Sequence, residues 1–477
     1  MQAMTLEEFK NLAEKAERIA VYFEIPAGDL TPVATYKFLC NELNDRGAIL
    51  EDLNTEGIER YSFLSFMPEA ELVINDEKVD LFDELRKMQT QFAFSTSEEV
   101  GKLITGSLGF LTYDAIRYIE EIPDRHQADA SLPTALFNFY SLSFAFDHAK
   151  KTILISKIVE VGECPFQSYS TAMEQIRELI QLLNRVPDIS DEIPAEKKYS
   201  EIKIEPDDDK FMNMVNVAKQ HIIQGDAFQI VLSRCFKRKF SASPIEIYKT
   251  LRKTSPSSFM FYFPAGENII IGASPERLVR VNQNEITVNP IAGTRKRTGE
   301  RSDEEIAVDL LTDIKELAEH RMLVDLARND VGSVSSKGSV NVTELLKVRH
   351  YSHVSHITST VIGKLRDDYD AFDALKACFP AGTLSGAPKI RAMEIIDALE
   401  TSRRGLYGGV ICRMDSLSNL ESCIAIRMAV LKDGIATIRT GAGIVFDSNP
   451  IAETEETGHK ANSMLNAIAK TEGEIIC

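Results

Sequence analysis

The stretch SDEEIAVDLLTDIKELAEHRMLVDLARNDV occupies residues 302–331, and apolar residues recur in it at intervals of three and four positions. That spacing is typical of an amphipathic helix with one buried face. The two preceding runs, NIIIGASPERLVRV (268–281) and EITVNPIAGT (285–294), instead have the apolar, β-branched composition of strands that lead into loops. Strands and helices are therefore mixed without regular βαβ alternation, which predicts an α+β fold.

The chain divides into three stretches around this segment. Residues 1–185 mix short strands with helices. Residues 186–209 are rich in Pro, Asp, Glu and Lys without an apolar period, which is typical of a surface connection. In residues 210–470 helical and strand signals alternate to the end. We therefore predict an N-terminal region, a connecting segment and a second region that contains the candidate site.

Composition limits the classes of partner and compartment. The 477 residues carry a net charge of −18, which argues against a nucleic-acid partner because such binding needs a basic patch. The first residues lack the apolar core of a signal peptide, and we find no apolar run of the ~18 residues that a membrane span needs. The seven cysteines have irregular spacing and no C-x-x-C pair. Reduced thiols and a cytoplasmic location are therefore expected.

Two pairs of glutamates share one spacing. Glu316 and Glu319 are three residues apart in the predicted helix, and Glu453 and Glu456 repeat this in IAETEETGHKANSML (451–465). Residues three apart share a helix face. Two such helices facing each other would supply four carboxylates, an oxygen-rich setting that suits Mg²⁺. The same spacing is also common on solvent-exposed helix faces, so both interpretations stay open on spacing alone.

Two glycine-containing segments could lie against an anion. FPAGTLSGAPK (379–389) has small residues that let backbone N–H groups approach a ligand, although it also fits an ordinary turn and is not a Walker A loop. TGAGIV (440–445), Arg427 and Tyr407 offer amides, a guanidinium and a phenol. Such groups suit a small dicarboxylate because arginine binds a carboxylate bidentately. Each of them alone also fits an ordinary strand.

A histidine on a predicted strand is a candidate proton shuttle. This residue is His356, in RHYSHVSHITSTV (349–361). An isolated histidine on a strand is more often structural. His353, three residues earlier, should point to the opposite strand face, so at most one of the two faces a given site.

The sequence motifs, taken together, resemble those of a known enzyme family. They are collinear over roughly residues 210–470 and resemble the chorismate-utilising enzymes, which include anthranilate, aminodeoxychorismate, isochorismate and salicylate synthases. In order, they are SPERL, PIAGT, ELAEHRMLVDLARNDVG, YSHVSHITSTV, FPAGTLSGAPKIRAMEII, LYGG, AIR and TGAGIV followed by E-x-x-E-T-x-x-K. The resemblance implies two β-sheets packed as a sandwich with helices outside, and makes residues 210–470 the chorismate-binding catalytic region.

The resemblance also implies a magnesium site and a substrate site. Glu319 and Glu456 would bind Mg²⁺ directly, and Glu316 and Glu453 would act mainly through water. The metal would hold the ring carboxylate of chorismate. The substrate-binding residues would be Gly293, Thr294, Tyr407, Arg427, Gly441, Ala442, Gly443 and Lys460.

Four residues would carry the chemistry if the resemblance holds. Glu276 of SPERL would be the general acid that protonates the departing 4-hydroxyl, which as hydroxide would be a poor leaving group. His356 would act as acid and base when the intermediate loses pyruvate. Thr383 and Gln229 would complete the catalytic set.

Two positions select a member of the family. Members that add water resemble one another in having a lysine where this chain has Gln229, and many aminodeoxychorismate synthases have a nucleophilic lysine where it has Ala292. Both positions favour direct attack of ammonia at C2, as in anthranilate synthase, a lyase that opens tryptophan biosynthesis. The N-terminal region is also similar to that of anthranilate synthase large subunits. The alternatives are aminodeoxychorismate synthase and a non-catalytic binding protein on the same scaffold.

Ammonia is expected to come from another chain. Glutamine amidotransferases of this pathway have a nucleophilic cysteine in a G-x-C-x-G turn, and no cysteine here has that context; Cys164 lies in GECPF, without the second glycine. We therefore expect a separate glutamine amidotransferase subunit and a hetero-oligomer.

The tryptophan pocket typical of these synthases differs in this chain. Relatives carry L-L-E-S and N-P-S-P-Y-M, whereas residues 49–52 read ILED and residues 255–260 read SPSSFM. An aspartate in place of a serine puts a charge near the indole, which is costly unless the carboxylate pairs with the ammonium group of the ligand. We expect weakened or altered tryptophan inhibition. The regulatory positions would be Glu51, Asp52, Pro256, Phe259 and Met260.

Overall fold

A computed structural model describes most of the chain. The described residues are 2–53, 60–75, 79–127, 132–187, 201–297, 301–350 and 354–474. His353 and most of the predicted connecting segment lie outside these ranges. No described helix is long and apolar enough to cross a membrane.

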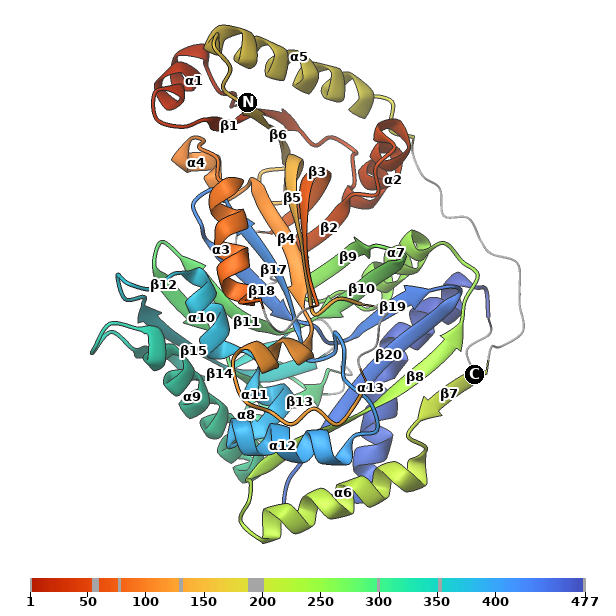
Figure 1. The fold of residues 1–477 in the computed structure, drawn as a ribbon. Coiled ribbons are helices and arrows are strands. Elements are labelled where there is room, and N and C mark those ends of the chain that lie inside the picture. Colours follow the sequence, from red (N-terminus) through yellow and green to blue (C-terminus); the bar gives the residue numbers. More distant parts are fainter. Residues whose placement is uncertain are drawn as a thin grey trace.

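Strand β5 (Ala135–Asp147) joins two arms of one antiparallel network (Figure 1). It pairs along its length with β3 (Tyr61–Ile74). Its other edge is shared by β4 (Thr105–Leu111) and β6 (Thr152–Glu160), and β6 in turn pairs with β1 (Arg18–Pro26). The junction is possible because β5 is long enough for two strands to lie end to end beside it.

The first arm continues from β3. Its next strands, in order of pairing, are β2 (Ala48–Asp52), β9 (Phe259–Ala265), β10 (Asn268–Ser274), β19 (Met428–Lys432), β20 (Ile435–Ile444) and β8 (Gln229–Lys239). Two short strands, β7 (Ile202–Glu205) and β16 (Gly386–Ala387), complete the far edge of β8.

The second arm continues from β4. Its strands are β17 (Val410–Asp415), β18 (Leu420–Ile424), β11 (Arg277–Asn282), β12 (Glu285–Val288), β15 (Val354–Lys364), β13 (Ile291–Lys296) and β14 (Asn341–His350).

The arms pack face to face through an apolar core. Phe110 of β4 meets Phe263 of β9 edge to face, with ring centroids 5.9 Å apart, a favourable aromatic geometry. The α+β class and the sandwich are therefore confirmed. The two predicted sheets are not separate, however, because β5 joins them into one twenty-stranded network.

Helices cover the outer faces of both arms. The first arm packs against α1 (Leu6–Ala13), α2 (Pro32–Leu43), α5 (Pro165–Leu183), α7 (Pro244–Thr254) and α13 (Pro450–Thr471), with α4 (Glu98–Gly101) at its edge. The second arm packs against α3 (Leu81–Gln91), the 3₁₀ helix η1 (Tyr113–Tyr118), α9 (Ile314–Val334), α10 (Ala371–Cys378) and α11 (Gly382–Ser385). Helices α6 (Asp208–Ile223) and α12 (Lys389–Leu399) flank β8 and β20, and α8 (Asp303–Thr312) packs on β15.

The long predicted helix at 302–331 is two helices. Asp313 has an extended backbone between α8 and α9, and its side chain accepts hydrogen bonds from the backbone N–H groups of Lys315 and Glu316. Aspartate is a strong N-cap residue because it satisfies N–H groups that have no partner inside the helix. The break fixes where α9 begins and thus which of its side chains point inward.

The predicted connecting segment is partly regular structure. Its last residues form β7 and the first turn of α6. The pairs β2–β9 and β4–β17 also join the N-terminal region to the second region in one network. The boundaries of the two regions therefore stay predictions.

Candidate active site

A cavity of about 650 Å³ opens where α9, α13, β8, β13, β15 and β20 approach one another. Every predicted catalytic, substrate-binding and metal residue lines it except Ala442. Ala442 lies between Gly441 and Gly443 on β20 and is fully buried in the apolar cluster under α6. Successive strand residues point to opposite faces, so the side chain of Ala442 points away from the cavity, and its assignment as a substrate-binding residue stays a prediction.

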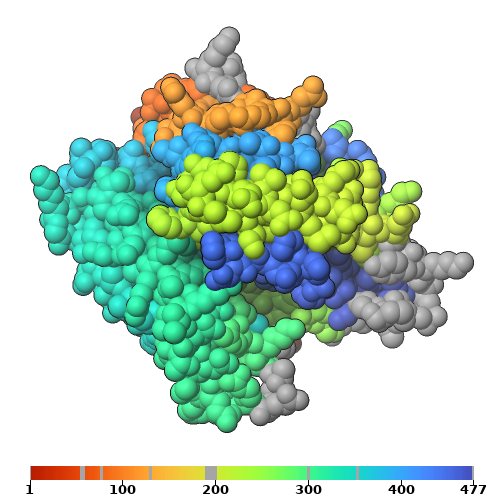
Figure 2. Space-filling view, turned by 90° about the horizontal axis from the view of Figure 1, so that it is seen from below, coloured from red at the N-terminus to blue at the C-terminus, as the bar shows by residue number. Residues whose placement is uncertain are grey.

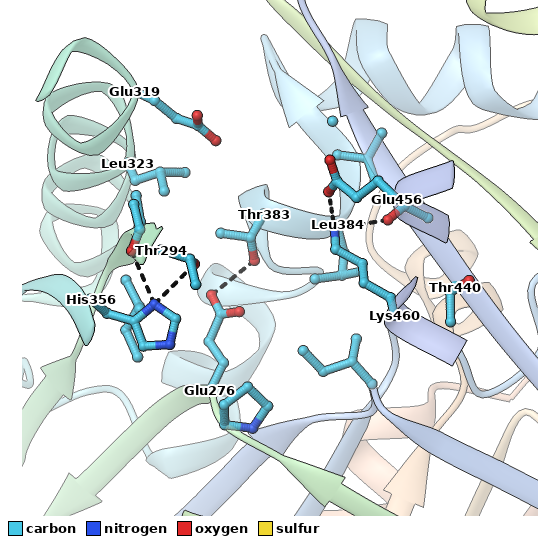
Figure 3. Close-up of a pocket in the computed structure, with 18 of the residues that line it drawn as sticks. Glu276, Thr294, Glu319, Leu323, His356, Thr383, Leu384, Thr440, Glu456 and Lys460 are labelled. Atoms are coloured by element: carbon cyan, nitrogen blue, oxygen red, sulfur yellow. Dashed lines mark hydrogen bonds and ion pairs between the residues drawn. The ribbon is translucent and has the colours of Figure 1, made fainter. Parts of the chain in front are cut away.

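Four glutamates enter the cavity from two helices. Glu316 and Glu319 project from α9, and Glu453 and Glu456 project from α13. Figure 3 shows Glu319 and Glu456 on opposite walls. Burial raises the pKa of Glu319, and the charge of Glu316 raises it further. Burial likewise raises the pKa of Glu453.

Cations already lie beside two of these carboxylates. Glu316 is 3.1 Å from Arg295, and Glu456 is 2.6 Å from Lys460, measured between nitrogen and oxygen. Within the described ranges, no three His, Cys, Asp or Glu side chains are close enough together to hold one metal ion. A cation shared by the four glutamates would therefore need water between itself and some of them. An all-oxygen donor set of this kind fits Mg²⁺, which keeps several waters.

Glu276 is partly buried at the cavity wall and held there by a hydrogen bond. It lies in the loop between β10 and β11, and the Thr383 hydroxyl donates a hydrogen bond to its Oε1 at 2.9 Å (Figure 3). Burial raises the pKa of Glu276 to about 7. A carboxyl group with this pKa is substantially protonated near neutral pH, as a general acid must be.

His356 is oriented by the strand opposite it. Its Nδ1 lies 3.0 Å from the Gly293 carbonyl oxygen and 3.1 Å from the Thr294 hydroxyl (Figure 3). A carbonyl oxygen can only accept, so Nδ1 carries the proton and Nε2 is the basic nitrogen. Burial lowers the pKa of His356, which favours the neutral ring. Gly293 has φ +66° at a register shift of β13, a conformation that suits glycine.

The pairing of β8 with β20 places two glycines against polar side chains. A Cβ on Gly441 would lie 2.7 Å from the Tyr407 hydroxyl, and a Cβ on Gly443 would lie 2.5 Å from the Gln229 amide nitrogen. Both distances are too short for a side chain, so only glycine fits at these two positions, and both glycines line the cavity. Lys460 donates a hydrogen bond to the Gly441 carbonyl at 2.9 Å.

Gln229 has an amide oxygen that no protein group satisfies. Its nitrogen lies 3.4 Å from Oε1 of Glu319, while its Oε1 is buried with no hydrogen-bond partner among the described residues. An unpaired buried acceptor is costly, and such groups often mark functional sites. The oxygen is therefore suited to accept an N–H from a bound molecule.

Arg427 supplies a positive charge from a strained backbone. It has φ +50°, the left-handed region, which is uncommon for residues other than glycine. Its side chain lines the cavity near Tyr407, and burial lowers its pKa without approaching neutrality, since arginine stays protonated in proteins. The conformation is consistent with a residue held to bind an anion.

The sequence interpretation missed several polar residues of the wall. Lys296 and Arg439 lie two residues from Thr294 and Gly441 on their strands, so the period of two could have found them. Arg439 is occupied structurally, since it donates to buried Glu400 at 3.0 Å. Lys315 lies four residues before Glu319 on α9 and His459 lies three residues after Glu456 on α13, so helix spacing could have found these two as well.

The predicted regulatory residues lie apart from the cavity, around β2 and β9. Glu51 pairs with Met260 across the strands and Asp52 pairs with Phe259, while Pro256 precedes β9. None of the five lines the cavity.

Glu51 and Asp52 have different surroundings. Glu51 is fully buried and accepts hydrogen bonds from Tyr248 at 2.6 Å and from Arg252 at 2.8 Å. Asp52 is 3.9 Å from the guanidinium of Arg277. The Asp52 carboxylate thus has a protein cation as its partner.

Comparison with known proteins identifies the family. A family model described as chorismate binding enzyme matches residues 47–466. The chain belongs to this chorismate-binding enzyme family. Anthranilate synthase component 1 of Acetivibrio thermocellus is 38% identical over 99% of both chains, and that of Bacillus caldotenax is 42% identical over 77% of this chain and 75% of the relative.

Solved structures of the chorismate-binding family have the same fold. Anthranilate synthase component I from Streptococcus pneumoniae superposes with a TM-score of 0.77 at 35% identity, over 92% of this chain and 99% of that one. A menaquinone-specific isochorismate synthase from Escherichia coli gives 0.72 at 17% identity over 97% and 99%, a likeness in fold alone.

The raised pKa of Glu276 predicts a pH-dependent stability difference. Wild-type stability falls as pH rises from about 4.5, the ordinary pKa of glutamate, through about 7, because the folded state must then bury a carboxylate. The Glu276→Gln variant has no carboxyl group to titrate at this position. Its free energy of unfolding should therefore rise relative to that of wild type as pH increases from about 4.5 to about 7, and the difference should level off at higher pH. Urea unfolding at pH 5 and pH 8 measures the difference. Glu267→Gln, at a side chain 82% exposed, is the control and should show no such trend. An identical pH dependence of Glu276→Gln and wild type would contradict the assignment.

Proposed function

We propose that this chain is the large subunit of an anthranilate synthase, in which chorismate is aminated at C2 with loss of its 4-hydroxyl and then eliminates pyruvate. The observation that carries the proposal is the pair Gln229 and Ala292 in the cavity wall, where an amide and a methyl group stand in place of ionisable side chains. Neither can activate water or attack the ring, so ammonia is left as the nucleophile. The reaction would open tryptophan biosynthesis, in a cytoplasm that keeps the free cysteines reduced.

The glutamates would hold Mg²⁺. Glu319 and Glu456 would bind it directly, and Glu316 and Glu453 would do so mainly through water. When bound, the ion would neutralise the ring carboxylate of chorismate and fix its position. The raised pKa values of Glu319 and Glu453 support this, because burial, together with a neighbouring glutamate charge, makes both carboxylates costly to keep charged without a cation.

The second carboxylate of chorismate, on its enolpyruvyl group, suits the opposite wall. Arg427 and the Tyr407 hydroxyl offer charge-assisted and neutral donors there, and Gly441 and Gly443 line the cavity beside Tyr407 and Gln229. Lys460 adds a positive charge beside Gly441. Opposed binding of two carboxylates would fix the ring between Glu276 and His356.

Amination needs an acid for the leaving group and a place for the nucleophile. Glu276 donates its proton to the 4-hydroxyl, which leaves as water. The unpaired Oε1 of Gln229 accepts a hydrogen bond from ammonia, which a lysine ammonium could not do. Thr383 keeps the Glu276 carboxyl in place.

Loss of pyruvate needs a base at C2. The hydrogen bond from Nδ1 to the Gly293 carbonyl leaves Nε2 of His356 as the basic nitrogen. His356 takes the C2 proton as the enolpyruvyl C–O bond breaks, and the ring becomes aromatic. The lowered pKa of His356 keeps it neutral and ready to accept this proton.

The direct test is turnover by the purified chain with chorismate, Mg²⁺ and ammonium at alkaline pH. We expect fluorescent anthranilate and an equal amount of pyruvate. Glu319→Gln should reduce turnover at least about 100-fold while leaving the fold intact, because it removes one proposed ligand of the metal. Asp325→Asn, at an exposed carboxylate of the same helix, should behave as wild type.

Two other results would favour one of the alternative functions over this proposal. An aminated chorismate that accumulates without pyruvate would indicate the aminodeoxychorismate synthase alternative. No turnover with ammonium or with an amidotransferase would indicate the non-catalytic binding protein.

A separate glutamine amidotransferase would supply ammonia to this cavity. No cysteine lines the cavity within the described part of the chain. Phe228, Phe446 and Ile451 are 73%, 62% and 59% exposed, and each lies within two residues of a lining residue. Figure 2 shows the side of the molecule on which α6, in yellow-green, lies beside blue C-terminal residues. Exposed apolar residues at a cavity mouth suit a protein partner that excludes water.

Substitution at this edge should separate the two nitrogen sources. Phe446→Ser combined with Ile451→Ser should lower the glutamine-dependent rate about tenfold at subsaturating partner, equivalent to ~1.4 kcal/mol of binding. The ammonium-dependent rate should stay unchanged, since neither side chain lines the cavity. Phe166→Ser, 56% exposed on distant α5, is the matched control. Equal loss of both rates would contradict the assignment of this surface.

Tryptophan inhibition should be weak or altered in this chain. The Asp52 carboxylate would face the indole, and Arg277 already pairs with it. Asp52→Ser should strengthen inhibition of anthranilate formation by tryptophan, while Asp29→Ser at an exposed loop position should not. Inhibition of wild type at micromolar tryptophan, unchanged by Asp52→Ser, would contradict this.

A further inference from the structure

A second, smaller cavity lies on the other side of Glu276. Its volume is about 50 Å³, enough for water. Glu276, Leu323 and Thr383 line both cavities and so form the wall between them. The proposed acid is therefore accessible from a side that the substrate does not occupy.

The smaller cavity also reaches a second carboxyl group. Asp330, in the last turns of α9, lines it. Lys389, at the start of α12, donates a hydrogen bond to Asp330 Oδ2 at 3.0 Å. The two side chains are 19% and 16% exposed, so water still reaches the pair.

The groups that face the two carboxyls differ. Asp330 faces Lys389 and the Cys378 thiol of α10, and burial raises the pKa of Asp330 while Lys389 lowers it. Glu276 faces Thr383, and the positive charge of Lys460 on α13 also acts on its carboxyl group. Both carboxyls therefore bind protons more readily than exposed ones, as members of a proton relay must.

Each turnover leaves Glu276 without its proton. The leaving hydroxyl takes it away as water, and the larger cavity is then filled by the aminated intermediate. The new ammonium group can lose its excess proton to solvent through that cavity's mouth. The Glu276 carboxylate must regain one proton before the next chorismate is aminated.

We propose that water in the smaller cavity carries protons to Glu276 from the Asp330–Lys389 pair. Glu276 takes a proton from that water, the water takes one from the pair, and solvent restores the pair. Only O–H and N–H bonds form and break, and no electrons are transferred. The proposal rests on the proposed function of Glu276 as the acid, and it makes Asp330 a relay residue that does not touch substrate.

Asp330→Asn tests the relay, because the amide keeps the shape of the side chain and cannot pass a proton in the same way. With ammonium as the nitrogen source, we expect kcat to fall about tenfold and KM for chorismate to stay unchanged. The expected fall is smaller than the effect of removing a general acid itself. The solvent deuterium isotope effect on kcat should rise. Imidazole buffer should restore part of the rate by delivering protons from outside. Asp325→Asn, 68% exposed on the same helix, is the matched control.

Filling the cavity tests the same route without removing a titratable group. Ala327 is buried and lines the smaller cavity, so Ala327→Val should displace its water and give the same lowered kcat with unchanged KM. If Asp330→Asn does not fold, this variant carries the test.

The outcomes separate this proposal from the function on which it rests. A wild-type chain that makes no anthranilate would overturn the function. If the wild-type chain is active and both variants have the same kcat and isotope effect as wild type, only the relay would be overturned. A third outcome is that kcat falls in Asp330→Asn, imidazole does not restore it, and Ala327→Val keeps the wild-type kcat. This would show that the Asp330–Lys389 pair only holds α12 against α9, and it would also overturn the relay.

Discussion

The repulsion among four glutamate carboxylates that enter one cavity is the constraint on which the site depends. Like charges on a shared helix face are unfavourable, and here two such pairs oppose each other on α9 and α13. The protein compensates them only in part, with Arg295 beside Glu316 and Lys460 beside Glu456. Burial and the neighbouring charge raise the pKa of Glu319. The cavity is thus built with an excess of carboxylate oxygen that a divalent cation would relieve, and chorismate, itself a dianion, would need that same cation.

The fold brings the four glutamates into one cavity through the two arms of strands that extend from β5. One arm ends in β8 and β20, where Gly441 and Gly443 line the cavity and leave room for the side chains of Tyr407 and Gln229. The other arm ends in β13 and β15, where the carbonyl of Gly293 orients His356. The apolar sandwich between the arms fixes the distance between these two ends. Helices α9 and α13 then close the cavity with the glutamates, while Glu276 in the β10–β11 loop completes its wall.

Much of this was predictable from residue patterns, and the failures have physical causes. Apolar periodicity predicted the helix at 302–331 but not its break, because the capping by Asp313 depends on one side chain and not on the period. The collinear motifs indicated nearly all of the cavity residues, but they could not show that the side chain of Ala442, unlike its glycine neighbours, points away from the cavity. The pairing of Asp52 with Arg277 could not be predicted, since it joins residues far apart in sequence. The smaller cavity behind Glu276 likewise exists only in the packing of α9 against the loop around Thr383.

We expect the carboxylate-lined cavity to accept the chorismate dianion only when a divalent cation is present. Calorimetric titration of the purified chain with chorismate, without ammonium, in the presence and absence of Mg²⁺ tests it most directly. We expect chorismate to bind in the presence of Mg²⁺ and to bind at least about tenfold more weakly in its absence. Because coupling between two ligands is mutual, bound chorismate should increase the affinity for Mg²⁺ by the same factor. Equal chorismate affinity in both conditions would contradict it.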